Sequence, residues 1–320
     1  MEELWRATLR DLVGAFPMAI SGAILAQKRG VSRVAVWKSV QALQKMGFPV
    51  QPSRKGYRLE ALPDSLFGPY LEVLLEETFP SLRVVFYPQT PSTSTAAKEL
   101  AHAGCPEGTL VVTENQTQGR GRLGREWFAE PQKSLAFSLL LRPPIEPRFC
   151  PALSLLVALS LTLALEDLGF SPTLKWPNDL FLSGKKVAGV LLESSLEMDR
   201  LEWVVAGVGV NVNGENFPPE LGDRATSLFL VKGEPVKRFE VLRAFLKVFG
   251  VEYHRFLEQK NFAPWIPLFS SRAPFLGKPV RVVSGEGAVQ GIAQQIDEEG
   301  ALWIEGRRFW WGEVSLLVNL

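Results

Sequence analysis

Residues 21–47 read SGAILAQKRGVSRVAVWKSVQALQKMG, and this stretch decides the fold of the first part of the chain. Its second half carries Val36, Val40 and Leu43, which recur at steps of four and three residues. That spacing is typical of an amphipathic helix. The stretch is divided by Gly-Val-Ser at residues 30–32, so we predict two helices joined by a short turn, a helix-turn-helix.

Capping residues and the following segment support this interpretation. Ser32 stands where it can cap the second helix, and Gly47 stands where it can end it. The next residues, FPVQPSRKGYRLE (48–60), are rich in β-forming residues around a turn, which predicts a small hairpin or wing. Residues 1–62 are therefore expected to form a winged helix-turn-helix domain.

Charge is concentrated in the same region. Residues 21–58 contain eight Lys or Arg and no Asp or Glu, whereas the whole chain has a formal net charge of only +1. Neutralisation of phosphates supplies most nonspecific DNA affinity, so the sequence predicts a DNA-binding face on the second helix and the wing. A winged helix that is vestigial or that binds protein is the alternative. The candidate DNA-binding residues are Ser32, Arg33, Trp37, Lys38, Arg54 and Lys55.

The rest of the chain mixes strands and helices. We expect an α+β sheet with helices on one side, because several strand-like runs follow one another with no helix between them. The predicted strands of this sheet are 82–88, 108–115, 134–142, 185–195 and 202–213, and the predicted helices are 95–102, 151–168 and 238–257. After Pro274 only short strand-like runs remain (278–284, 287–296, 301–306 and 307–317), which predicts a small separate barrel.

Composition is that of a globular protein, with 46% hydrophobic and 22% charged residues. Two cysteines, Cys105 and Cys150, make no disulfide framework and match no metal-binding spacing. The uncharged run 152–165 is too short to cross a bilayer and suits a buried helix. The first residues lack the layout of a signal peptide, so we expect a cytoplasmic protein without a membrane partner.

The loop GRGRLGREW (119–127) concentrates three arginines and three glycines in seven positions. Glycine lets the backbone approach a ligand closely, and arginine offers a charged fork for carboxylate or phosphate. The loop predicts a mobile flap that folds around an anion, with a solvated loop that touches RNA loosely as the alternative. It is neither a Walker loop nor a dinucleotide fingerprint.

Four further motifs each allow a structural and a functional interpretation. KWPNDL (175–180) is either a turn with a buried tryptophan or a place where Asp179 helps to hold Mg²⁺. KKVAG (185–189) offers Lys186, either solvated or in a site, beside Gly189. GVGVNVN (207–213) has strand glycines that mark close approach of a ligand or another backbone, and Asn211 could read a base edge. STST (92–95) either caps a helix or binds a small ligand.

Taken in this order, the motifs resemble those of the bifunctional biotin–protein ligases that also repress biotin operons. The resemblance runs from the winged helix through GRGRLGREW, KWPNDL, KKVAG and GVGVNVN to the closing GEVSL (312–316). It implies an α+β multidomain protein with a class II synthetase-like central domain of mixed sheet at 67–270. It also implies a C-terminal SH3-like β-barrel at 274–320.

The resemblance implies that ATP and biotin are substrates, that Mg²⁺ accompanies the phosphates, and that the product biotinyl-5′-AMP delivers biotin to a carrier lysine. The partners would be a biotin carboxyl carrier domain of acetyl-CoA carboxylase or a similar carboxylase, operator DNA, and a second copy of the chain once the adenylate is bound. The implied catalytic residues are Arg122, Lys186 and Asp179, with Asp179 also the metal candidate. Biotin would contact Ser92, Thr93, Ser94, Gln116, Arg120, Gly121, Arg122, Lys186 and Gly189, and the nucleotide would contact Gly119, Arg120, Arg122, Trp127, Lys186 and Asn211.

Two alternatives stay open at this point. Ligases of a related acyl cofactor such as lipoate have a similar fold, although their loop does not usually read GRGRLGREW. A repressor that senses a ligand and performs no chemistry is the other alternative, and the joint presence of Arg120, Arg122, Asp179 and Lys186 argues against it.

Overall fold

The computed structural model describes residues 4–76, 78–79, 81–222, 224–284 and 287–317. The chain divides into two compact units, residues 1–77 and 78–320. The first unit holds three helices and a hairpin, followed by a fourth helix that packs against the first helix. Its elements are α1 (Leu4–Ala15), α2 (Gly22–Arg29), α3 (Arg33–Lys45), β1 (Val50–Ser53), β2 (Gly56–Leu59) and α4 (Gly68–Leu75).

The predicted helix-turn-helix is confirmed in the first unit. Helix α2 ends at Gly30, whose φ of 63° is the left-handed conformation that glycine adopts readily. Ser32 caps α3, because its Oγ accepts a hydrogen bond from the backbone N–H of Ala35 at 3.1 Å. Gly47 follows the last turn of α3 with a φ of 88°. The antiparallel hairpin β1–β2 then supplies the predicted wing.

A buried carboxylate holds two of these helices together. Asp11 of α1 is 2% exposed, and its oxygens accept from Lys28 Nζ at 2.5 Å and from Arg29 Nη2 at 2.8 Å. Both cations lie in the last turn of α2, where the helix dipole also favours positive charge. Two of the eight positive charges of residues 21–58 therefore serve the internal packing of this unit.

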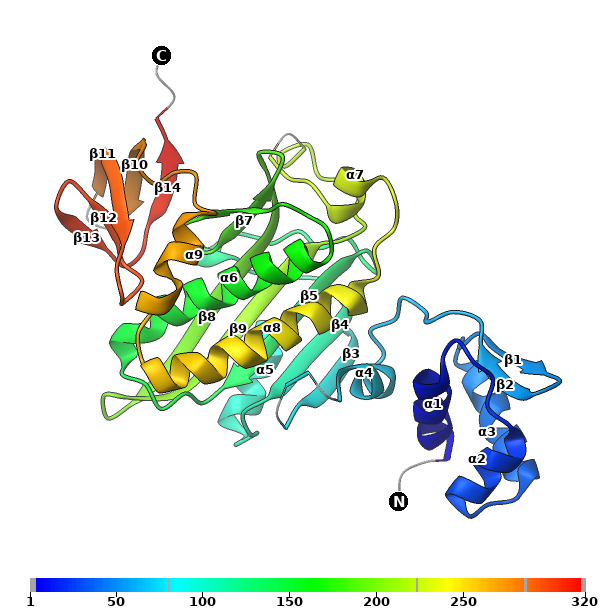
Figure 1. The fold of residues 1–320 in the computed structure, drawn as a ribbon. Helices are drawn as coiled ribbons and strands as arrows, with labels where there is room; N and C mark the ends of the chain where they lie inside the picture. Colours follow the sequence, from blue (N-terminus) through cyan, green and yellow to red (C-terminus); the bar gives the residue numbers. More distant parts are fainter. Residues whose placement is uncertain (1–3, 77, 80, 223, 285–286, 318–320) are drawn as a thin grey trace. The chain divides into compact units, whose positions relative to one another are not determined.

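The second unit is built on a seven-stranded mixed sheet in the order β3-β4-β5-β9-β8-β7-β6 (Figure 1). Only β3 and β4 pair in parallel, and the other neighbours are antiparallel. The strands are β3 (Arg83–Thr90), β4 (Thr109–Gln116), β5 (Ser134–Leu141), β6 (Thr173–Lys175), β7 (Asp179–Leu182), β8 (Lys185–Glu197) and β9 (Arg200–Asn211). The helices are α5 (Thr93–His102), α6 (Cys150–Asp167), α7 (Leu228–Lys232), α8 (Arg238–Gln259) and α9 (Ile266–Ser270), with single 3₁₀ turns at Arg122–Gly124, Pro147–Phe149 and Ala263–Trp265.

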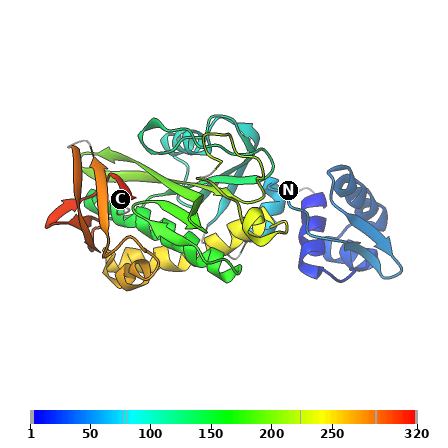
Figure 2. The same cartoon turned by 90° about the horizontal axis from the view of Figure 1, so that it is seen from above.

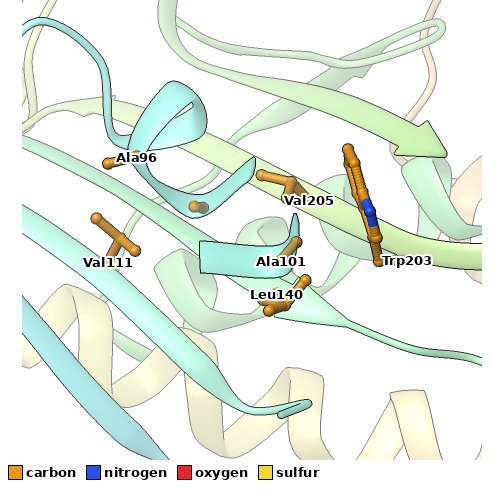
Figure 3. Close-up of a cluster of buried hydrophobic side chains, with 7 residues drawn as sticks. Ala96, Ala101, Val111, Leu140, Trp203 and Val205 are labelled. Carbon is orange, nitrogen blue, oxygen red and sulfur yellow. The ribbon is translucent and has the colours of Figure 1, made fainter. Parts of the chain in front are cut away.

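Helices cover both faces of this sheet, so the expectation of helices on one side was wrong. Every residue of β5 is buried, which requires cover above and below the strand. On one face Phe137 meets Phe245 of α8, with ring centroids 5.3 Å apart. On the other face Leu140 joins Ala97 and Ala101 of α5 in an apolar cluster (Figure 3). The sheet thus lies between α5 and the pair α6–α8 (Figure 2).

Helix α6 is the buried helix that the sequence predicted. In the part of the chain that the structure describes, the segment Pro147–Asp167 is the one helix long and apolar enough to cross a membrane. Two thirds of its most apolar window is buried inside the protein, where α6 packs against α8 and β8. It is a core helix of the second unit.

A five-stranded antiparallel sheet ends the chain, in the order β13-β12-β11-β10-β14. Its strands are β10 (Pro279–Ser284), β11 (Gly287–Ile296), β12 (Leu302–Ile304), β13 (Arg307–Phe309) and β14 (Glu313–Leu316). The expected single strand at 307–317 is two strands, because the chain turns at Gly312 with a φ of 150°. Trp176, which is 1% exposed, donates its Nε1–H to the carbonyl oxygen of Gly300 at 3.1 Å and ties this sheet to the larger one.

The Trp176 hydrogen bond gives a stability prediction. Trp176→Phe should lower the free energy of unfolding by roughly 2 to 3 kcal/mol, because it leaves a buried carbonyl without a donor and opens a small cavity. Urea unfolding followed by circular dichroism measures the change. The half-exposed Trp310 is the matched control, and Trp310→Phe should cost about 0.5 kcal/mol or less. Equal losses in the two variants would contradict the role given to Trp176.

Candidate functional site

The motifs singled out in the sequence surround one cavity of about 670 Å³ in the second unit. The cavity lies where the 119–127 loop, the turn between β6 and β7, and strands β8 and β9 meet. The predicted ligase residues that line it are Ser92, Thr93, Ser94, Gln116, Arg120, Gly121, Arg122, Trp127, Asp179, Lys186, Gly189 and Asn211. Gly119 is buried behind this lining, where a Cβ would lie 2.4 Å from the carbonyl oxygen of Trp127.

Part of the cavity lining is a face of β9 on which two of three residues are glycines. Gly207, Gly209 and Asn211 alternate along β9 and so share one face of the sheet. A Cβ on Gly209 would lie 2.5 Å from the indole of Trp127, and a Cβ on Gly207 would lie 2.4 Å from Ser94 Oγ. The glycines therefore make room for side chains of the chain itself, where the sequence analysis expected a ligand or another backbone.

The Gly- and Arg-rich loop is a closed hairpin. The backbones of Arg120 and Glu126 form an antiparallel β-bridge. On either side of it, the N–H of Gly121 donates to the carbonyl oxygen of Arg125 at 2.7 Å, and the N–H of Trp127 donates to that of Gly119 at 2.9 Å. This geometry places Arg120, Arg122 and Trp127 along one wall of the cavity. Within the described part of the chain the Arg120 guanidinium has no hydrogen-bond or ion-pair partner, so it is available to a bound anion.

Arg122 links the loop to two other segments of the cavity lining. Its Nη1 donates to Asn178 Oδ1 and to the carbonyl oxygen of Gly312, both at 3.3 Å. Burial lowers the pKa of Arg122, and the nearby carboxylates of Asp179 and Glu313 partly oppose that shift. Both acceptors are neutral, so a charged group of a ligand would be a stronger partner for this guanidinium than either of them.

Arg125 ties the loop to the C-terminal sheet. Its guanidinium forms a two-pronged contact with Glu313, at 2.9 Å to Oε1 and 2.5 Å to Oε2. The hydrogen bonds from Arg125 lower the pKa of Glu313, and the same contact raises the pKa of Arg125. Because both side chains are largely exposed, the pair contributes little to global stability and acts on the position of the loop.

Lys186 and Asp179 form an ion pair inside the cavity. Lys186 Nζ lies 2.7 Å from Asp179 Oδ1 and 5.5 Å from the centre of the Trp127 ring. A Cβ on Gly189 would lie 3.4 Å from both charged atoms, so this glycine leaves space for the pair. No group of three His, Cys, Asp or Glu side chains arranged for a metal occurs among the described residues. A Mg²⁺ ion here would depend on phosphate oxygens for most of its ligands.

Hydroxyl and amide groups line the other end of the cavity. Ser92 caps α5, as its Oγ accepts from the N–H of Thr95 at 3.4 Å. Gln116 Oε1 accepts from the N–H of Thr93 at 2.9 Å, and Ser94 Oγ lies 3.1 Å from Ser138 Oγ. The capping interpretation of the STST motif is confirmed. The capped helix end also borders the cavity, and binding of a small ligand there stays a prediction.

Two buried polar atoms of the cavity wall have no partner. Trp127 Nε1 and Asn211 Oδ1 are shielded from solvent and make no hydrogen bond, while Asn211 Nδ2 donates to Thr226 at 3.1 Å. Buried polar groups in proteins are normally paired. Trp127 Nε1 lies against β9, because a Cβ on Gly209 would be 2.6 Å from it.

The candidate DNA-binding residues lie in the first unit and share an exposed surface of α3 and the wing. Arg33, Lys38, Arg54 and Lys55 are exposed, and Trp37 is 48% exposed, which is unusual for so large an apolar side chain. Ser32 is used as the helix cap. Apart from Lys28 and Arg29, no cation of residues 21–58 has an ion-pair partner in the described chain.

Sequence reasoning missed three parts of the cavity. Asn178 and Gly312 accept hydrogen bonds from Arg122, and Glu313 pairs with Arg125. The signal for Asn178 was its place in KWPNDL, and that for Gly312 and Glu313 was the closing GEVSL motif. Nothing in the sequence indicates that GEVSL lies beside the 119–127 loop, which is 188 residues away from it along the chain.

Three family patterns match the chain. The Biotin/lipoate A/B protein ligase family matches residues 86–211, an HTH domain matches residues 14–58, and the Biotin protein ligase C terminal domain matches residues 275–316. The three matches correspond to the winged helix, most of the larger sheet, and the C-terminal sheet.

One relative matches nearly the full length of the chain, and two others match two thirds or more of it. The chain is 38% identical to the Bifunctional ligase/repressor BirA of Bacillus subtilis (strain 168), over 94% of this chain and 95% of that protein. It is 36% identical to the Biotin–[acetyl-CoA-carboxylase] ligase of Paracoccus denitrificans, over 68% of this chain and 92% of that protein. The solved biotin protein ligase from Aquifex aeolicus in complex with biotin and ATP matches 74% of this chain and 99% of its own, at 34% identity and a TM-score of 0.63.

The contact between Arg125 and Glu313 predicts a pH effect on the loop. Glu313→Gln should speed exchange of the Gly121 and Trp127 amide hydrogens about threefold at neutral pH. In the native protein the pair is present above the ordinary glutamate pKa and is lost as pH falls through the lowered pKa of Glu313. Exchange rates corrected for intrinsic pH dependence should therefore rise in acid in the native protein and show no such step in Glu313→Gln. Glu99→Gln, on α5, is the control and should behave as the native protein does.

Proposed function

The chain belongs to the bifunctional biotin–protein ligase/repressor family, and from that premise we propose the following reaction and binding activity. The protein activates biotin with ATP to biotinyl-5′-AMP and transfers the biotinyl group to a lysine of a biotin carboxyl carrier domain. It also represses biotin genes by binding operator DNA. The relative from Paracoccus denitrificans is named for acetyl-CoA carboxylase, so we take the carrier domain of that enzyme or of a similar carboxylase as the acceptor.

One observation carries the ligase proposal: the lining of a single cavity brings together hydroxyl and amide groups, several cations, and an indole beside a carboxamide. Biotin has a polar ring at one end and a carboxylate at the other. We assign the ring to Ser92, Thr93, Ser94 and Gln116, and the carboxylate to the middle, where Arg120, Gly121, Arg122, Lys186 and Gly189 lie. We assign adenine to Trp127 and Asn211, which place an indole ring and a carboxamide in the lining of the same cavity.

The first step joins two anions and therefore needs cations. A carboxylate oxygen of biotin attacks the α-phosphorus of ATP, the bond to the β-phosphate oxygen breaks, and pyrophosphate leaves. Arg120, Arg122 and Lys186 neutralise the charge that builds up, in a cavity where water screens it little. Mg²⁺ would supply further positive charge on the phosphates, and we propose that Asp179 would be its protein carboxylate, with Lys186 directed to the substrate oxygens instead.

The second step needs no nucleophile from this chain. The amine of the carrier lysine attacks the acyl carbon, AMP leaves with its phosphate oxygens, and the amine gives up a proton. Until then the mixed anhydride must be kept from water, which is a task for the loop held across the cavity mouth by Arg122 and Arg125. We place this chemistry in the cytoplasm.

Incubation with ATP, labelled biotin and a carrier domain tests the ligase proposal. We expect pyrophosphate release and label on one carrier lysine. The family pattern also names lipoate, so lipoate in place of biotin tests the related acyl cofactor, and we expect no transfer. Binding of biotin without pyrophosphate release would favour a sensor that performs no chemistry.

Arg122 provides a test of intermediate retention. Arg122→Gly removes a charged donor from the loop, so biotinyl-5′-AMP should escape roughly ten to a hundred times faster and label unrelated lysines. Mass spectrometry of bystander proteins measures that label. Arg281→Ala on β10 is the control and should label only the carrier, because Arg281 is exposed and has no ion-pair partner among the described residues. Unchanged retention in Arg122→Gly would count against the role proposed for this arginine.

For DNA binding we propose that α3 enters the major groove and the wing contacts phosphates. Arg33 and Lys38 flank the exposed Trp37 along α3, and the turn of the wing carries the exposed cations Arg54 and Lys55, so both elements offer positive charge to phosphates. We further propose that the adenylate-bound protein is a homodimer, because two symmetric heads fit a palindromic operator.

Salt dependence tests the DNA proposal. The duplex is one that the protein selects from a random pool in the presence of biotin and ATP. The logarithm of its association constant with the protein should fall steeply with the logarithm of the salt concentration. Lys55→Ala should reduce the slope by about 1 per head, since each phosphate contact releases about one counterion. Lys28→Ala is the matched control, because Lys28 already pairs with Asp11, and its slope should stay near the native value. Salt-insensitive binding would contradict the proposal.

A further inference from the structure

The backbone of α5 fixes the orientation of the Gln116 amide. The N–H of Thr93, the first residue of that helix, lies 2.9 Å from Gln116 Oε1. A backbone N–H can only donate, so the atom that it meets must be the amide oxygen. The Nε2 group is thereby directed to the other side, where a Cβ on Gly119 would lie 2.6 Å from it.

The same amide oxygen sets the direction of a chain of hydroxyls. Thr93 Oγ1 lies 3.2 Å from Gln116 Oε1, and since a carbonyl oxygen only accepts, the threonine must donate. Its proton is then used, so Thr93 Oγ1 accepts from Ser138 Oγ at 2.9 Å. Ser138 has one proton and has donated it, so at 3.1 Å it must accept the proton of Ser94.

Burial keeps water from replacing these hydrogen bonds and so preserves the direction in which each hydroxyl donates. Ser138 is fully buried at the centre of β5, and Thr93 and Ser94 are 3% and 8% exposed. In such surroundings a hydrogen bond is stronger than in water and its partners polarise one another. Ser94 is also held in place sterically, because its Oγ occupies the space that a Cβ on Gly207 would need.

We infer that Ser138, which does not line the cavity, is a positioning residue: it decides which groups around the biotin ring donate hydrogen bonds and which accept them. This inference rests on the proposed function. With its proton committed to Ser138, Ser94 offers only lone pairs to the cavity. Gln116 Nε2 offers only donors. A cyclic urea matches both groups, because its N–H can donate to Ser94 Oγ and its carbonyl oxygen can accept from Gln116 Nε2. A ring that presents an acceptor atom to Ser94 binds less well, because the lone pairs of the two atoms repel each other.

The test uses biotin and its two cyclic carbamate analogues, in which a ring oxygen replaces one or the other ureido N–H. Pyrophosphate release with ATP, in the presence of the carrier domain so that the protein turns over, gives kcat and KM. For the native protein, kcat/KM for biotin should exceed kcat/KM for one of the two carbamates about a hundredfold. Ser138→Ala should narrow that preference about tenfold, because the Ser94 hydroxyl can then turn and donate to the ring oxygen, with kcat and the KM for ATP unchanged.

Two controls separate positioning from general structure. Ser160 of α6 is also fully buried, and its hydroxyl makes no hydrogen bond, so Ser160→Ala should leave the preference at the native value. Ser138 acts through Ser94, so in a Ser94→Ala background the Ser138→Ala change should have no further effect on the preference. A merely structural Ser138 would raise KM for biotin and both carbamates alike and would do so in either background.

The outcomes distinguish the two levels of the proposal. If the native protein releases no pyrophosphate with biotin and ATP, the proposed function itself is wrong and this inference falls with it. If the native protein is active but Ser138→Ala leaves the biotin-to-carbamate ratio unchanged, or changes it equally in the Ser94→Ala background, the proposed function stands and Ser138 has no positioning role.

Discussion

The cavity depends on the missing Cβ atoms of Gly207 and Gly209 on one face of β9. Glycine within a strand costs roughly 0.5 to 1 kcal/mol each relative to alanine, yet here it lets Ser94 and the Trp127 indole lie directly against the sheet. The neighbouring strand β5 also has small residues at these positions, because Ser138 is the register partner of Gly207 and Ala136 that of Gly209. Small residues on two adjacent central strands thus make a hollow in a sheet whose other face is fully packed by large apolar side chains.

Charge inside this hollow is arranged so that the cations have local partners before an anion arrives. Lys186 pairs with Asp179, Arg125 pairs with Glu313, and Arg122 rests on two neutral acceptors. In the function that we propose, an anionic ligand replaces these contacts with charge-assisted hydrogen bonds to the same cations. Arg120, which has no such partner in the described chain, is the cation most readily used for first contact.

The first unit uses charge in two ways. Asp11 recruits Lys28 and Arg29 to hold α1 against α2, and the remaining cations of residues 21–58 stay on the surface of α3 and the wing. The sequence shows eight equivalent positive charges in this region. Only the packing of α1 separates those that stabilise the unit from those that face outward.

Local patterns were sufficient for the helix-turn-helix, for most strands of the sheet and for the buried helix α6, since spacing and capping act within a few residues. The motifs also named twelve residues that line one cavity, because their chemistry resembles that of a known family. What only the tertiary structure decided is long-range: α5 on the second face of the sheet, Glu313 beside Arg125, and Ser138 beneath Ser94. These contacts join residues far apart in the chain. The residues next to a strand serine or a loop glutamate in the sequence do not determine which distant residue it will contact.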